Sequence, residues 1–123
     1  MTLLYVGVFG LLGVFSRYFI GILFKKFFNT TFPYDTFIIN ILGAFLIGIV
    51  FVLGTEKNQI SPELRSGIMI GFLGGFTTFS SYCLDAIKMF ENLKYAQGLL
   101  YISLSPIIGT CAAILGILIA RKI

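Results

Sequence analysis

The sequence contains no histidine and no tryptophan, and only 11% of its 123 residues are charged. Without histidine, imidazole metal sites, histidine-ligated haem and Ser–His or Cys–His nucleophilic sites are excluded. Cysteine is also scarce: Cys83 and Cys111 lie in apolar stretches without CxxC spacing, so we interpret both as small apolar side chains. The nine basic residues form no long run, and nucleic-acid binding is therefore not expected.

Apolar residues, by contrast, make up 58% of the chain, and the mean hydropathy is +1.00. A soluble domain has roughly 45–50% apolar and about 25% charged residues. Polar side chains are thus too scarce to cover a globule in water. The composition predicts a multi-pass integral membrane protein rather than an enzyme, and the length allows a single domain over residues 1–123.

Four apolar segments are separated by short polar connections. They are Leu3–Phe24, Thr36–Gly54, Ser66 to about Phe90, and Gly98–Ala120. Each is close to the roughly 20 residues that a helix needs to cross about 30 Å of hydrocarbon. The start of the chain lacks the basic region and cleavage site of a signal peptide, so we expect the first segment to be retained. The predicted fold is all-α, with four transmembrane helices.

The third segment is predicted to be broken near the middle of the membrane. Ser61 and Pro62 form a good helix start, and a helix over Pro62–Leu73 would be about 18 Å long. It then meets Gly74–Thr78, two glycines and two threonines around one phenylalanine, which form a poor helix interior. A second helix is expected over Phe79–Phe90. Carbonyl groups exposed at such a break must be satisfied by protein or by an ion.

Basic residues are distributed evenly between the two predicted sides of the membrane. One side has Lys57, Arg65, Arg121 and Lys122, and the other has Lys25, Lys26, Lys88 and Lys94. A membrane protein normally has an excess on the cytoplasmic side. Either this balance is chance in a small count, or the chain inserts in both orientations, which would permit an antiparallel dimer.

Several polar side chains lie within the apolar segments, where burial is costly and often functional. On one face of the second segment are Thr36, Asn40, Gly43, Ala44 and Gly48. Close helix packing explains the small residues, but the amide of Asn40 has two donors and two acceptor sites to satisfy. In the fourth segment, Tyr101 and Ser105 form either a polar track or part of a packing seam, and Pro106 is expected to loosen the helix beside them.

Three further features of the segments have more than one interpretation from the sequence alone. Phe79 and Tyr82 lie three residues apart and are expected to stack, although such aromatics usually face lipid or core. Arg17 lies deep enough in the first segment to require a partner or a path for its charge to reach water. Asp85 lies near the end of the third segment and is expected to reach the interface.

The first, second and fourth segments contain no acidic residue, which argues against a proton-coupled exporter. A small multidrug exporter has a similar length but needs a membrane-embedded glutamate in its first helix. The donors present are an amide, hydroxyls and the positive edges of aromatic rings. Together they favour a small anion as the transported species.

Three motifs resemble those of the Fluc (CrcB) fluoride channels of microbes, and the resemblance covers the whole chain. They are the glycine-rich GLLGVFSRY of Gly10–Tyr18, the TFIINILG of Thr36–Gly43, and the GFLGGFTTFS of Gly71–Ser80. The third is the most specific of the family's motifs. The order, spacing and chain length all fit the family.

The resemblance implies a passive, fluoride-specific channel in the plasma or inner membrane, formed by an antiparallel dual-topology dimer. The implied fluoride pathway consists of Thr36, Asn40, Phe79, Tyr82, Tyr101 and Ser105. Tyr82 departs from the family, which has phenylalanine there. Backbone carbonyls of Gly74 and Thr77 from each subunit are implied to hold a structural Na⁺, while Arg17, Gly75 and Thr78 are expected to serve the structure. The partner would be a second copy or a paralogue. A multidrug-type exporter and a non-transporting membrane subunit are the alternatives.

Overall fold

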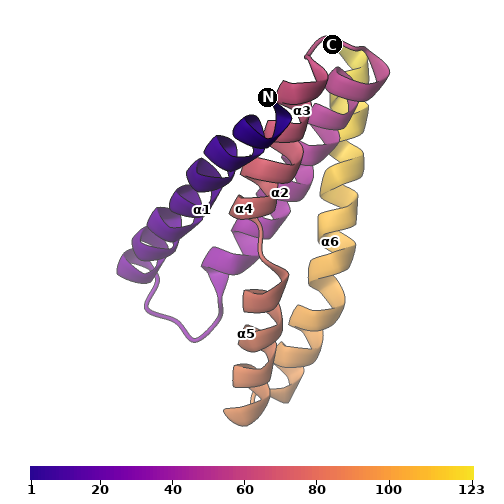
Figure 1. Ribbon diagram of the computed structural model, residues 1–123. Coiled ribbons are helices and arrows are strands. Elements are labelled where there is room, and N and C mark those ends of the chain that lie inside the picture. Colours follow the sequence, from indigo (N-terminus) through magenta and orange to yellow (C-terminus); the bar gives the residue numbers. More distant parts are fainter.

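The computed structural model describes all residues from 1 to 123 as a bundle of helices without strands (Figure 1). The elements are α1 (Thr2–Phe27), α2 (Tyr34–Phe51), η1 (Val52–Glu56), α3 (Pro62–Ser66), η2 (Gly67–Leu73), α4 (Gly74–Phe76), α5 (Phe79–Glu91) and α6 (Tyr95–Lys122). The two η elements are π-helical and continue neighbouring α-helices without interruption.

Four helical stretches are long and apolar enough to cross a membrane, which confirms the predicted fold class. They are Thr2–Phe27, Tyr34–Glu56, Pro62–Glu91 and Tyr95–Lys122. Each extends beyond its predicted apolar segment because polar and basic residues at the ends, such as Lys25 and Lys26, continue the helix. Both termini lie at the same end of the bundle (Figure 1), as an even number of spans requires.

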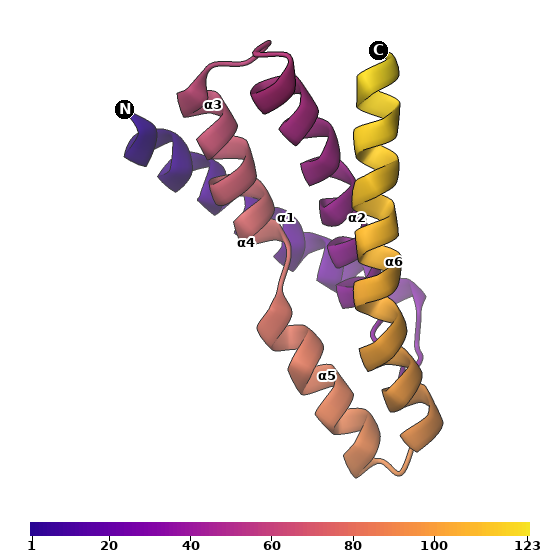
Figure 2. The ribbon, with the colours of Figure 1, turned by 90° about the vertical axis from the view of Figure 1, so that its right-hand side faces the viewer.

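The third span begins as predicted and is interrupted over a shorter stretch than predicted. Ser61 caps its start, with the Leu64 amide donating to the Ser61 hydroxyl at 3.2 Å. Only Thr77 and Thr78 are extended, with φ/ψ of −82°/159° and −149°/121°. The prediction that the break includes Gly74 was wrong, because Gly74 is helical at φ −63° and ψ −38°. The β-branched threonines leave the helix, whereas the glycines are held in it by packing. Figure 2 shows the extended connection between α4 and α5.

Glycines on α1 and the third span bring the two backbones into direct contact. A Cβ atom on Gly13 would lie 2.1 Å from the Phe72 carbonyl oxygen. One on Gly75 would lie 2.7 Å from the Gly10 carbonyl oxygen. Such close approach between helices is typical of small residues in membrane proteins. Tight packing of α1 thus supports the helical half of the third span up to the break.

The small residues of α2 serve two different neighbours rather than one. A Cβ atom on Gly48 would lie 2.2 Å from the Ala113 carbonyl oxygen of α6. On Gly43 it would lie 2.2 Å from the Thr77 methyl group at the break. The single face predicted for these residues is therefore divided: one part packs on α6 and the other supports the break. Only 18 of the 123 residues are buried, as expected where lipid covers most of the surface.

Candidate ion pathway

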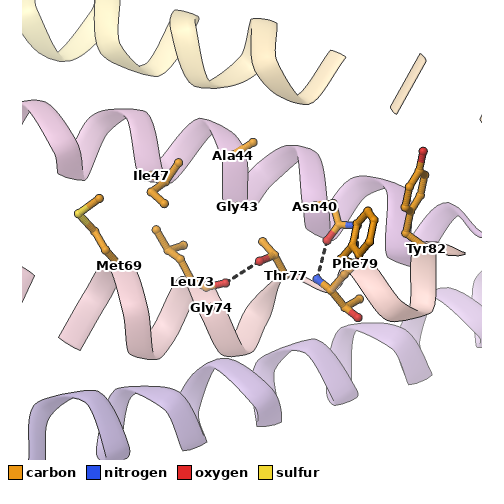
Figure 3. A pocket seen from close by; sticks show the side chains of 11 residues that line it. Asn40, Gly43, Ala44, Ile47, Met69, Leu73, Gly74, Thr77, Phe79 and Tyr82 are labelled. Carbon is orange, nitrogen blue, oxygen red and sulfur yellow. Dashed lines mark hydrogen bonds between the residues drawn. The ribbon is translucent and has the colours of Figure 1, made fainter. Parts of the chain in front are cut away.

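Asn40 on α2 is bonded to the backbone of the helix break in both directions. Its Nδ2 atom donates to the Thr78 carbonyl oxygen at 2.9 Å. The Thr78 amide donates to its Oδ1 atom at 2.8 Å (Figure 3). Two of the polar groups that the sequence left unsatisfied are thereby paired, and one Nδ2 hydrogen remains free. Asn40 thus holds the extended segment in place and still has a donor to offer.

The same arrangement removes the usual donors from two carbonyl groups. In a continuous helix, the Thr78 amide would donate to Gly74 and the Ser81 amide to Thr77. Instead, the Thr78 amide donates to Asn40, and the Ser81 amide donates to the Thr78 hydroxyl at 3.2 Å. The Gly74 and Thr77 carbonyl oxygens therefore lack their helical partners at the level of the break.

The Thr77 side chain faces its own helix. Its hydroxyl donates to the Leu73 carbonyl oxygen at 2.8 Å (Figure 3), while its methyl group contacts Gly43. The Thr77 hydroxyl is thus occupied by the backbone, and any ligand at this residue would be bound through the main chain.

Phe79 and Tyr82 lie on α5, directly after the break, with their ring centroids 5.8 Å apart. Phe79 is 76% exposed in the single chain, whereas Tyr82 is only 9% exposed. Both rings line a groove of about 340 Å³ that also contains Asn40, Gly74 and Thr77 (Figure 3). The structure therefore brings the predicted aromatic pair, the predicted amide and the predicted break together.

A second groove, of about 400 Å³, continues from these residues along α6. It contains Asn40, Phe79, Tyr82 and Ser105. The Tyr101 ring lies 5.0 Å from the Tyr82 ring, and the Tyr101 hydroxyl and Ser105 hydroxyl are both buried without a hydrogen-bond partner. Ser105 therefore does not form the backbone bond that a pure packing role would favour. The Ser105 hydroxyl lies in this groove, whereas the Tyr101 hydroxyl lies beside Tyr82 and the Asp85 carboxylate.

Thr36 and Asp85 lie apart from these grooves, in a cavity of about 390 Å³ beneath the connection between α1 and α2. Thr36 is 7% exposed. Asp85 is half-buried beside Lys88, and its Oδ2 atom has no hydrogen-bond partner.

Arg17 lines a further cavity, of about 320 Å³, together with Thr36, Thr78 and Ser81. It forms no ion pair or hydrogen bond within the chain. The expectation that Arg17 has a partner within its own chain is therefore not met, and a path to water stays a prediction. Ser81 was missed by the sequence reasoning, although it lies one helical turn after the break.

Residues 4–117 match the family model described as CrcB-like protein, Camphor Resistance (CrcB). The chain belongs to the CrcB family. The match reaches all four spans of this CrcB chain, includes the break and both grooves, and confirms the resemblance seen in the three motifs.

Curated relatives of this CrcB chain have the printed name "Fluoride-specific ion channel FluC". One from Hahella chejuensis (strain KCTC 2396) is 43% identical over 121 residues, covering 98% of this chain and 95% of the relative. One from Flavobacterium psychrophilum is 37% identical over 122 residues, covering 99% and 98%. One from Synechococcus sp. is 41% identical over 109 residues, covering 89% and 84%.

Proposed function

We propose that this chain is a fluoride channel that lets fluoride leave the cytoplasm passively. The observation that carries the proposal is the buried Ser105 hydroxyl, which has no hydrogen-bond partner and lines one groove with the free Asn40 donor and the Phe79 ring. A buried donor without an acceptor is costly, and a small anion would provide that acceptor. The names of the whole-length relatives support fluoride as the anion.

The physical problem for such a channel is to replace the tight hydration shell of fluoride. Amide and hydroxyl hydrogens, together with positive ring edges, can do so at close range in a narrow path. No coupling to an energy source is needed, because an inside-negative potential favours anion exit by about 2.3 kcal/mol per 100 mV. Hydrogen fluoride enters neutral and dissociates inside, so the trapped anion requires only an exit.

The two alternatives differ from this proposal in specific ways. A multidrug-type exporter needs an acidic residue in its first helix, and α1 contains none. A non-transporting subunit would give no flux without a larger partner. Release of fluoride from liposomes that contain only the purified chain supports the channel, whereas release only in the presence of another protein would support the subunit.

The partner in this proposal is a second copy of the chain in antiparallel orientation. The groove at the break is open in the single chain, and Phe79 and Gly74 are exposed there. A second copy would cover these residues, and the equal number of basic residues on the two sides allows it to insert the other way round.

Reporters fused to the C-terminus test this arrangement. We expect both orientations in comparable amounts, because four basic residues lie on each side. Adding two lysines to the connection between η1 and α3 should shift the population strongly toward one orientation. A single fixed orientation of the unmodified chain would contradict the antiparallel homodimer and leave a paralogue as the partner.

A structural Na⁺ between the two copies completes the proposal. The Gly74 and Thr77 carbonyls fit such an ion, because their helical donors are engaged elsewhere. Neutral oxygen ligands suit a hard cation of low charge, whereas a divalent ion would recruit carboxylates. The ion would satisfy carbonyl groups that lipid cannot satisfy.

Removal of Na⁺ tests this part of the proposal separately. With a large organic cation in its place, we expect slower fluoride efflux or a weaker dimer. Thr77→Ser is the control variant, since its hydroxyl can still donate to Leu73 and the proposed ligand is a main-chain oxygen. Unchanged flux and unchanged dimer stability under strict exclusion of Na⁺ would remove the ion from the account.

A further inference from the structure

The Tyr82 hydroxyl is bonded to the backbone of α6. It donates to the Ile102 carbonyl oxygen at 2.6 Å, and the side chain is 9% exposed. The bond joins α5 to α6 across 20 positions of sequence. Main-chain carbonyls inside a helix are normally occupied by the amide four residues later, so this acceptor requires an explanation.

Pro106 provides the explanation. It lies four residues after Ile102, within the continuous helix α6. Proline has no backbone N–H, so the Ile102 carbonyl has no donor from that position in its own helix. In lipid, such a carbonyl must find another partner, and the Tyr82 hydroxyl is that partner. Pro106 and Tyr82 also line the same groove, together with Asn40, Phe79 and Ser105.

We propose that Pro106 is a positioning residue: it frees the Ile102 carbonyl, which binds the Tyr82 hydroxyl and fixes the Tyr82 ring as an aromatic wall of the pathway. This inference rests on the proposed fluoride pathway. The Tyr82 hydroxyl is thereby withheld from the anion, while the neighbouring Tyr101 and Ser105 hydroxyls remain without partners. Tyrosine at this position then presents its carbon–hydrogen ring to the groove, as phenylalanine would.

The alternative role for this hydroxyl is direct donation to the ion. The two roles differ in how Tyr82 depends on residue 106. If the hydroxyl donates directly to the ion, Tyr82→Phe should reduce flux equally with proline or alanine at position 106. If the hydroxyl instead binds the freed Ile102 carbonyl, Tyr82→Phe should reduce flux only while proline occupies position 106. Pro106→Ala gives the Ile102 carbonyl a helical N–H donor. Because a carbonyl oxygen can accept two hydrogen bonds, the Tyr82 hydroxyl can still donate to it as well.

The test is a double-mutant cycle with Tyr82→Phe, Pro106→Ala and the combined variant. For each protein we measure the fluoride efflux rate, the fluoride-to-chloride flux ratio and the thermal stability in detergent. We expect Tyr82→Phe alone to shift the folding equilibrium about fivefold or more toward the unfolded state, the size expected for one unsatisfied buried carbonyl, and to slow efflux because the ring is no longer fixed. In the combined variant, efflux, flux ratio and stability should return close to wild type. Tyr18→Phe is the matched control, because Tyr18 is 65% exposed and forms no hydrogen bond through its hydroxyl.

Equal losses of flux from Tyr82→Phe with proline or alanine at 106 would overturn the proposal. If Tyr82→Phe fails to fold, recovery of the folded protein by Pro106→Ala supports the proposal, and failure to recover it overturns it. The thermal stabilities of the four proteins can be compared without measuring transport. This comparison therefore tests the Tyr82–Ile102 bond even if the wild-type chain releases no fluoride, a result that would contradict the proposed function instead.

Discussion

Asn40→Asp is expected to reduce fluoride efflux by about a hundredfold or more, since bringing two like charges together costs several kcal/mol and about 1.4 kcal/mol of barrier corresponds to a tenfold change in rate. The shape of the side chain is nearly unchanged. One carboxylate oxygen can still accept from the Thr78 amide, but the other would face the Thr78 carbonyl oxygen in place of a donor. The variant also puts a negative charge where the proposed anion passes and removes the free Nδ2 hydrogen.

Asn92→Asp is the matched control for this substitution. The Nδ2 atom of Asn92 also donates to a carbonyl oxygen, that of Lys88 at 2.8 Å, but at an exposed position. Fluoride efflux through the Asn92→Asp variant should remain near that of the wild type, because water can solvate the new charge. Efflux is measured from liposomes, and size-exclusion chromatography reports whether each variant assembles. An assembled Asn40→Asp protein with near-normal fluoride efflux would contradict the assignment of Asn40 to the pathway.

Gly74→Leu is expected to abolish both dimer formation and fluoride flux while leaving the single chain folded. Gly74 has ordinary helical dihedral angles, so no special backbone freedom is lost. A Cβ atom there would meet only the Met69 carbonyl oxygen within the chain, at 3.9 Å. A loss of the dimer would therefore arise from a partner that approaches Gly74 closely, whereas a loss of flux alone would also follow from a leucine side chain that fills the groove lined by Gly74.

Gly7→Leu serves as its control. A Cβ atom on Gly7 has no neighbour within 4 Å, and Gly7 lies on α1, away from the break. Both substitutions add the same side chain to an open helical position. Circular dichroism should give equal helix content for both, whereas crosslinking in liposomes should show the dimer only for Gly7→Leu. Normal crosslinking and flux in Gly74→Leu would show that the face at Gly74 is not the interface.

The helical spans and the location of the break were predictable because hydropathy and local propensity depend on sequence alone. Four apolar segments, the Ser61 cap and the two threonines at the break follow from such local rules. The error at Gly74–Phe76 has a tertiary cause. Glycine is a poor helix former, but contacts such as that between Gly75 and Gly10 hold this segment in the helix.

The proposed site was predictable as a set of residue types but not as a set of bonds. Sequence spacing identified Asn40 as a buried amide without revealing that Thr78 pairs with it in both directions. The hydrogen-bond partner of the Tyr82 hydroxyl was likewise not predictable from sequence spacing. Its acceptor lies on another helix and exists because of a proline that the sequence suggested only as a loosened turn. Long-range pairing of this kind depends on how the helices cross.

The most direct measurement is fluoride release from liposomes that contain only this chain, followed with a fluoride-selective electrode. A potassium ionophore supplies the compensating charge movement. The account predicts fast fluoride release that requires the ionophore, as expected for a bare anion moving through a passive channel, and little release of chloride under the same conditions. Fluoride release no faster than from protein-free liposomes, or equal release of chloride, would contradict it.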